Sequence, residues 1–379
     1  MTLEYYIFKN GWDNIPDSAL DSSQTLVLVF GSSDIGKISE PLEYIKNSFK
    51  NSVIIGASSA GEILMDELEE DSLVVAVLKF VNTTVRLSTE YIESAEDSFL
   101  VGQNISSSLS DNDLKAIFVL SDGLNVNGSR LTSGINSTLD PDTIVTGGLG
   151  GDCDRFESTW VVIDGEAKSN YVTAVGLYGE NIHIGHGFKG GWDKFGIQRV
   201  VTRSHNNILY ELDNQPALDI YKKYLGDKAR ELPASGLLFP LELQEDINSD
   251  KKTVRTILAI DEKERSITFA GDIPEGSSVS LMKANHDRLI DGAFNASKSV
   301  NLDDYNNEPL LCIAISCIGR KLVLKQRVED ELEATLQNLP SDTKQIGFYS
   351  YGEISPITSG GCDLHNQTMT LTLLWESES

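Results

Sequence analysis

Two segments of the chain carry a serine and a glutamate at the same spacing. Residues 55–63 (IGASSAGEI) and 346–354 (IGFYSYGEI) agree at six of nine positions without a gap. Each segment follows a predicted strand, a short polar turn and a helix, so the context of the match is repeated as well as its letters. We interpret the two regions as a duplicated β-helix-β unit.

The duplication predicts a binding site that the two units build together. If they pack about a pseudo-twofold axis, Ser59 and Glu62 lie opposite Ser350 and Glu353 in an interface cleft, the usual place for a small ligand. The alternative is structural: the glycines shape identical turns, and the glutamates cap helices or face water, because helix N-termini favour acidic residues.

A second motif has the spacing of a phosphate-binding loop. Gly31 to Lys37 fits G-x-x-x-x-G-K after a predicted strand. Ile38 stands where the motif needs Ser or Thr to hold Mg²⁺, and Ser39 comes one position too late. Asp122, at the end of an apolar strand, is a candidate magnesium ligand. A structural turn is the main interpretation, and a P-loop-like NTPase is the minor alternative.

Two further glycine motifs each lack one essential residue. Gly147 to Asp152 resembles a dinucleotide-binding turn, but Cys153 occupies the place of the third glycine. Gly56 to Ala60 fails as a nucleophile elbow because that motif demands glycine where Ala60 stands. Neither predicts catalysis.

The histidines and cysteines do not form a closed metal site. His183 and His186 lie three apart on a predicted strand, where such positions face opposite sides, and Cys362 with His365 offers two ligands. The absence of C-x-x-C-H excludes covalent haem attachment and leaves a non-covalent haem on one axial histidine. The cysteines, which are Cys153, Cys312, Cys317 and Cys362, are too few and scattered for a disulfide framework, which places the chain in a reducing cytoplasm.

Length and charge exclude several classes of protein. The 379 residues correspond to two or three packing units, with 40% hydrophobic and 23% charged residues. No apolar run reaches the 18 residues of a membrane span, and the N-terminus lacks the pattern of a signal peptide. The formal net charge of −26 repels nucleic acid and anionic lipid.

The elements that position these residues predict a mixed α/β (α+β) fold with mixed sheets. Strands at 26–30 and 53–55 flank a helix that starts at Pro41, and 73–78 with 85–91 reads as a hairpin. Residues 157–178 read as two strands about the turn at Asp164. A helix over 217–225 ends at Gly226. We place the domain boundary just before it, giving domains 1–215 and 216–379.

The motifs over residues about 25 to 375 resemble the FIST sensory family. The N-terminal half matches at 55–63, 120–123, 147–152, 186–192 and 201–203, and the C-terminal half matches at 280–285, 347–356 and 364–372. The resemblance implies a FIST N-like domain followed by a FIST C-like domain. It also implies a bacterial, intracellular ligand-sensing module rather than an enzyme.

Proteins made of both FIST halves resemble the NosP type of nitric-oxide sensor. That resemblance implies haem b bound without a covalent link, with His365 as first choice for the iron ligand and His186 as second. Arg203 and Lys189 are expected to bind the haem propionates, since buried carboxylates are stabilised by hydrogen bonds from cationic side chains.

The sequence has no output module of its own, so the signal must leave through a partner. The resemblance implies a separate histidine kinase, or a diguanylate cyclase or phosphodiesterase, and it is compatible with a homodimer. The alternative is a FIST sensor of a small organic ligand such as an amino acid, held between the four serines and glutamates named above.

Overall fold

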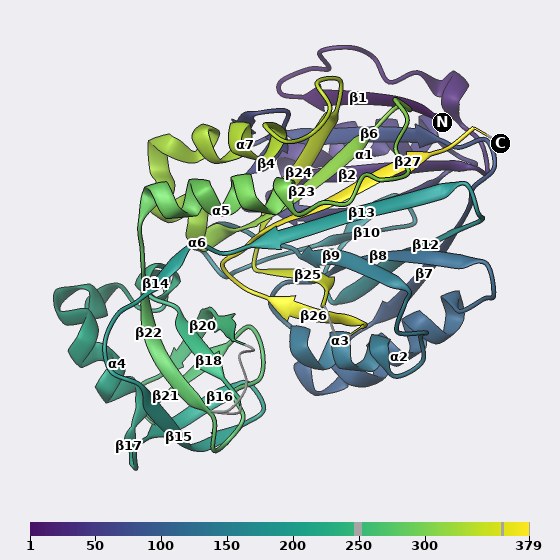
Figure 1. The fold of residues 1–379 in the computed structure, drawn as a ribbon. Helices are drawn as coiled ribbons and strands as arrows, with labels where there is room; N and C mark the ends of the chain where they lie inside the picture. The colour runs from purple at the N-terminus through teal and green to yellow at the C-terminus, as the bar shows by residue number, and fades with distance from the viewer. Residues whose placement is uncertain (246–251, 358–359, 379) are drawn as a thin grey trace.

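Three mixed sheets form the body of the protein, and a fourth sheet forms a small lobe at its side (Figure 1). The computed structural model describes residues 1–245, 252–357 and 360–378, and these four sheets are counted within those residues. The first sheet has the order β1 (Thr2–Phe8), β6 (Leu73–Lys79), β2 (Thr25–Ser32), β3 (Val53–Ser59), β10 (Val161–Ile163), β11 (Glu166–Lys168). The second has the order β26 (Cys362–His365), β25 (Gly352–Pro356), β9 (Ile144–Leu149), β8 (Leu114–Ser121), β12 (Tyr171–Tyr178), β7 (Thr84–Tyr91). The third has the order β13 (Ile182–Lys189), β27 (Met369–Glu376), β23 (Leu311–Cys317), β24 (Lys344–Ser350), β4 (Glu62–Leu64), β5 (Glu67–Glu69).

Each sheet of the body is built on a parallel pair of strands. The pairs are β2 with β3, β8 with β9, and β23 with β24. The connecting helices are α1 (Ile35–Ser48), α3 (Gly128–Asn136), and the consecutive α6 (Ile318–Leu324) and α7 (Val328–Leu336). An antiparallel strand lies beside each pair: β6, β12 and β27. The predicted duplication is thus confirmed, and the described residues contain a third copy of the unit.

Each unit gives its following hairpin to a different sheet. The chain leaves β3 for the β4–β5 hairpin of the third sheet, β24 for β25–β26 of the second, and β9 for β10–β11 of the first. The exchange is cyclic, so the three units are related by a pseudo-threefold arrangement rather than the pseudo-twofold one that the sequence predicts.

Glycine at one equivalent position lets each parallel pair close up. A Cβ added to Gly56, Gly147 or Gly347 would stand 2.3, 1.8 or 1.7 Å from a carbonyl oxygen of the neighbouring strand. Gly347 is in register with Ala314 as Gly56 is with Val29. The glycines of the repeated motif are therefore required by strand packing.

The main core lies between the three sheets, and the helices cover their outer faces. Phe30 of the first sheet stacks on Phe348 of the third at 4.7 Å between ring centroids, inside a cluster of buried aliphatic residues. Outside, α1 buries Ile38, Leu42 and Ile45 at helical spacing against the first sheet. The second sheet is covered by α2 (Ser98–Leu109) with α3, and the third by α5 (His286–Lys298) with α7.

The small lobe is formed by the described residues 192–245 and 252–284. Its elements in chain order are β14 (Trp192–Lys194), β15 (Arg199–His205), β16 (Ile208–Leu212), β17 (Gln215–Pro216), α4 (Ala217–Leu225), β18 (Leu241–Gln244), β19 (Thr253–Arg255), β20 (Ile257–Asp261), β21 (Ser266–Phe269) and β22 (Ser278–Ala284). The sequence boundary at residue 215 falls within this lobe, where β17 pairs with β16. The stretches 1–215 and 216–379 share this sheet as well as the second and third, so they interleave in space.

Several local expectations are wrong. β6 and β7 are not a hairpin: they belong to the first and second sheets, because a strand pattern does not specify its partner. α1 begins at Ile35, where the Asp34 carboxylate accepts the Gly36 N–H at 3.0 Å, and Pro41 lies inside it. Residues 157–178 contain three strands, β10 to β12. Among the described residues, we find no helix both long and apolar enough to cross a bilayer.

Candidate functional site

The carboxyl ends of the three parallel pairs meet at one end of the body. Backbone hydrogen bonds join them in a ring: Gly151 N–H donates to Ser58 at 3.1 Å, Ala60 N–H to Tyr349 at 2.9 Å, and Tyr351 N–H to Leu149 at 3.2 Å. Carboxyl ends of parallel strands are the usual ligand-binding edge of α/β folds. We call this place the axial site.

One connection departs from the threefold pattern, and it lies over the axial site. Two residues separate β3 from β4 and one separates β24 from β25, whereas residues 150–160 separate β9 from β10. Within this covering segment, Arg155 donates to Ser33 Oγ at 2.5 Å, and Cys153 Sγ donates to the Ala60 carbonyl at 3.5 Å. The extra residues of the second unit are therefore packed against the strand ends of the first.

A single buried carboxylate holds the covering segment in place. Asp152 is 1% exposed and accepts the N–H groups of Phe156, Glu157 and Ser158 at 2.8–3.0 Å, as well as the Tyr351 hydroxyl. Burial and the Asp152 carboxylate raise the pKa of Tyr351, so its hydroxyl stays a donor. The Phe156 ring stacks on Tyr351 at 5.0 Å. Sequence reasoning met Asp152 as the end of a glycine-rich turn and missed this role.

The covering segment contains strained backbone. Cys153 and Phe156 have φ values of +67° and +54°, in the left-handed region that non-glycine residues rarely adopt. Such strain is found at sites where the surrounding contacts over-determine the backbone.

The predicted ligand residues lie at the axial site as two separate pairs. Ser72 donates its N–H and hydroxyl to Glu62 Oε2 at 3.1 and 2.8 Å, and Ser59 Oγ accepts the Gly61 N–H at 2.8 Å. The two repeated segments touch through Ala60 and Tyr349. The first pair is nonetheless 1–3% exposed, and its hydrogen bonds are made to Gly61 in the same turn and to Ser72.

The second pair is enclosed in the same way. Glu353 accepts the Ser350 hydroxyl at 2.7 Å and the Thr368 N–H and hydroxyl at 3.1 and 2.9 Å, and both Ser350 and Glu353 are 0% exposed. Burial raises the pKa of Glu62 to about 7 and that of Glu353 to about 8, which outweighs their hydrogen bonds.

The Glu353 pair connects the axial site to the small lobe. Next to Thr368, Gln367 Nε2 donates to the Leu237 carbonyl at 3.0 Å and to Thr256 Oγ1 at 3.1 Å, and the Gln367 carbonyl accepts Trp192 Nε1 at 3.1 Å. A rearrangement that breaks the hydrogen bonds of Glu353 with Thr368 would therefore also displace the neighbouring Gln367, which forms the contact between body and lobe.

A cation stands at the rim of the axial site. Lys321 Nζ donates to the Ala60 carbonyl at 2.7 Å and to Glu70 at 2.6 Å. Burial raises the pKa of the Cys153 thiol, although Lys321 and Arg155 oppose the rise. The thiol is thus a neutral neighbour of the ring of strand ends rather than an activated nucleophile.

The P-loop-like segment is a tight strand-to-helix turn. β2 runs to Ser32 and α1 starts at Ile35, so Ser33 and Asp34 are the whole connection. The Asp34 carboxylate takes an N–H at the helix start, and Lys37 pairs with Asp71 at 2.7 Å. A phosphate cradle needs a wider loop with free N–H groups.

The predicted haem ligands lie near one another, between the second and third sheets. The His365 ring of β26 lies 4.3 Å from the Phe188 ring of β13, and His186 precedes Phe188 by two residues on the same strand face. Burial lowers the pKa of His186, which favours the neutral, metal-binding imidazole. The donor chemistry fits an iron ligand.

The rest of a haem site does not fit. The hollows of about 490, 470 and 650 Å³ described for the surface have no histidine in their linings. Arg203 lies in the small lobe, where its Nε donates to Glu211 at 3.1 Å, and Lys189 is three residues beyond His186, on the opposite strand face. Among the described residues, no three or more His, Cys, Asp or Glu side chains gather as a site for a bare metal ion, a requirement that haem with one axial histidine does not share.

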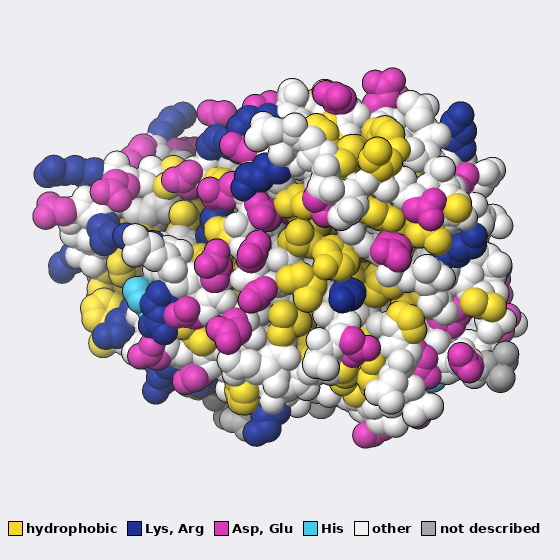
Figure 2. All heavy atoms as spheres, turned by 90° about the horizontal axis from the view of Figure 1, so that it is seen from above, with side chains coloured by type: hydrophobic (Ala, Val, Ile, Leu, Met, Phe, Trp, Pro, Cys, Tyr) yellow, Lys and Arg dark blue, Asp and Glu magenta, His cyan; other side chains and the backbone are white. Residues whose placement is uncertain are grey.

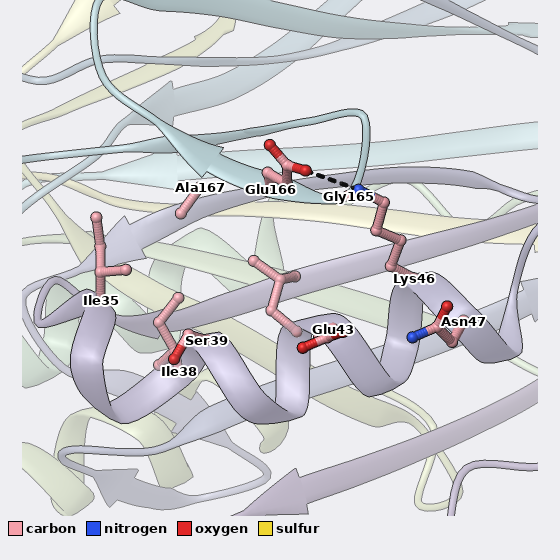
Figure 3. Close-up of a pocket in the computed structure, with 10 residues that line it drawn as sticks. Ile35, Ile38, Ser39, Glu43, Lys46, Asn47, Gly165, Glu166 and Ala167 are labelled. Carbon is pink, nitrogen blue, oxygen red and sulfur yellow. Dashed lines mark hydrogen bonds and ion pairs between the residues drawn. The ribbon is translucent and has the colours of Figure 1, made fainter.

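The hollow of about 490 Å³ lies between α1 and β11, on the outer face of the first sheet (Figure 3). Ile35, Ile38 and Ala167 give it an apolar side, and the ion pair of Lys46 with Glu166, at 2.8 Å, closes one end. It contains none of the predicted site residues. The sequence did not predict this hollow, because a helix that starts at Pro41 leaves out the residues of α1 from Ile35 to Glu40, several of which line it.

Comparison with known proteins identifies both halves of the chain. A family model described as the FIST N domain matches residues 25–215, and one described as the FIST C domain matches residues 217–356. An uncharacterized protein of Methanocaldococcus jannaschii is 26% identical over 237 residues. The matched region makes up 55% of this chain and 44% of that relative, so the chain spans less than half of the relative's length.

Proposed function

The chain belongs to the FIST family of sensory signal-transduction domains, and from this premise we propose that it is a receptor, rather than an enzyme, for a small organic ligand at the axial site. The observation that carries the proposal is the break in the threefold pattern. At the edge where α/β folds bind ligands, one of three equivalent connections is lengthened to residues 150–160 and lies across the strand ends.

The chemistry of the site favours a ligand with an amine, such as an amino acid. Ser59, Glu62, Ser350 and Glu353 supply hydroxyls and carboxyls next to the strand ends that form the axial site. A cation next to a carboxyl lowers its pKa, so an ammonium group would convert Glu62 or Glu353 to the ionised form and gain a charge-assisted hydrogen bond.

Ligand entry requires the covering segment to move. Its anchors to the rest of the body are the contacts of Asp152 and Phe156 with Tyr351. The hydrogen bonds of Arg155 to Ser33 and of Cys153 to Ala60 hold it as well. When Glu353 exchanges Thr368 for the ligand, the adjacent Gln367 shifts its contacts with the lobe. A separate histidine kinase, or an enzyme that makes or degrades cyclic-di-GMP, would read that change.

Calorimetric titration with the common amino acids and small amines tests the proposal. We expect at least one ligand to bind, and Glu353→Gln and Glu62→Gln to weaken it at least about tenfold by removing the charge. Glu180→Gln, at an exposed turn, is the matched control and should bind as the unaltered protein does. Absence of binding across the panel, or equal affinity in all four proteins, would rule out this site.

A haem-based nitric-oxide sensor is the second candidate, favoured by the neutral His186 and by His365 against Phe188. Bound haem would supply an iron atom that coordinates nitric oxide, and His365 would hold it. Because neither histidine lines the hollows named above, we expect β13 and β26 to separate when haem binds. Visible absorption after haem loading tests this candidate: no Soret band eliminates it, and a band unchanged in both His365→Ala and His186→Ala excludes these ligands.

A further inference from the structure

The charge of the chain is divided very unevenly between body and lobe. The small lobe, residues 192–284, contains 13 Lys and Arg against 15 Asp and Glu, a net charge of −2. The remainder of the −26 therefore belongs to the rest of the chain, which carries −24. Figure 2 shows acidic side chains spread over the face seen from above. Two bodies repel each other, whereas two lobes do not.

The lobe also exposes apolar side chains around an apolar hollow. Phe195, Ile197 and Tyr224 are 43%, 63% and 37% exposed, and we call these three residues the lobe patch. Ile197 and Tyr224 line a hollow whose floor includes Leu281, and the Phe195 N–H donates to the Leu281 carbonyl at 2.6 Å. The patch is thus continuous with the core of the lobe rather than a set of scattered side chains.

Two cations beside the lobe patch are paired within the lobe, and a third, Lys283, has its Nζ 5.3 Å from the centroid of the Phe195 ring. Arg199, which lines the hollow, pairs with Asp213 at 2.8 Å and donates to the Tyr224 hydroxyl at 3.2 Å. Lys194, next to Phe195, pairs with Glu242 at 2.6 Å. For Arg199 and Lys194, a partner that covers the patch therefore does not have to supply a carboxylate.

We infer that the lobe patch is the interface of a homodimer, in which two copies of this chain pack lobe to lobe. A second copy presents the same nearly neutral, apolar surface, so the contact can be self-complementary about a twofold axis. A basic partner would be drawn to the strongly acidic body instead.

The interface lies on the lobe that the axial site contacts through Gln367. The dimer itself requires no ligand, so the inference stands apart from the proposed receptor function. A ligand-induced shift of the lobes would alter how the two copies are held, and a partner protein could detect it.

Sedimentation velocity on the full chain, over a concentration series, tests the dimer. We expect a species of twice the chain mass and a dimer dissociation constant that rises at least about 100-fold in Ile197→Asp, because the aspartate enters a twofold interface twice. Ile197→Ser removes the apolar group without adding charge and should weaken the dimer in the same direction.

Leu100→Asp is the matched control, since Leu100 is 56% exposed on α2 of the body. It should leave the dimer intact. Circular dichroism and the thermal midpoint show whether each variant is folded. The inference is overturned if the unaltered protein is monomeric at all concentrations, which is also the result expected if the patch binds a different protein. It is overturned as well if Ile197→Asp and Leu100→Asp weaken the dimer equally.

Discussion

Glu62 and Glu353 occupy equivalent places in two units, and burial governs the chemistry of both. Each is at most 1% exposed and accepts hydrogen bonds from hydroxyl and N–H groups. In the third unit the corresponding residue is Cys153, which is half-buried and belongs to the covering segment itself. Two units therefore supply the carboxyl groups of the axial site, and the unit of β8 and β9 supplies the strained covering segment.

The raised pKa of Glu62 predicts that stability falls as pH rises. The folded-state pKa, about 7, lies above the pKa of 4.5 that an unburied glutamate has. Below pH 4.5 both states are protonated. Between about pH 4.5 and 7 the unfolded chain ionises first, so the free energy of unfolding falls by on the order of 3 kcal/mol and stays low above pH 7.

Urea unfolding of Glu62→Gln at pH 5 and pH 8 checks this prediction. The neutral amide cannot ionise, so the loss of stability between the two pH values should shrink relative to the unaltered protein. Glu180→Gln should keep the full pH dependence. A pH dependence of the same size in all three proteins would show that Glu62 ionises normally in the fold.

At the scale of elements, the parallel pairs depend on glycines that leave no room for a Cβ. Gly347→Ala would place a methyl group 1.7 Å from the Ala314 carbonyl oxygen, and backbone cannot move aside as a side chain can. We expect this substitution to destabilise the protein by at least about 3 kcal/mol, or to prevent folding, because β23 and β24 must separate.

Gly190→Ala is the control for that substitution. Its Cβ would come no closer than 3.8 Å to the Gln367 carbonyl oxygen, so the change should cost less than about 1 kcal/mol. Denaturant unfolding of both variants measures the difference. Equal stability of Gly347→Ala and Gly190→Ala would mean that the third parallel pair is not as close as the structure has it.

At the scale of the whole molecule, the uneven charge predicts that the dimer becomes more stable as the salt concentration rises. Ion-pair complexes weaken as salt screens their attraction, whereas here the long-range force between two copies is repulsion between acidic bodies. We expect the dimer dissociation constant to fall when NaCl is raised from 50 to about 300 mM. Sedimentation at the two salt concentrations measures it, and weaker dimers at high salt would point to an interface of ion pairs instead.

The sequence by itself determined the local features: strands at 26–30 and 53–55, a helix that ends at Gly226, the mixed α/β class and the repeated unit. These follow from apolar periodicity, glycine placement and the letters of the repeat, which act over a few residues. The family resemblance added the sensory role, to which both domain models agree.

Tertiary structure decided which strands pair, and hence where the site lies. The third unit retains Gly147 but little else of the repeated motif, so the threefold arrangement becomes visible through the partners of β9 and β25. The exchange of hairpins and the burial of Asp152 bring together residues that lie far apart in the chain. Such contacts depend on the packing of whole sheets, a property that no local pattern of side chains encodes.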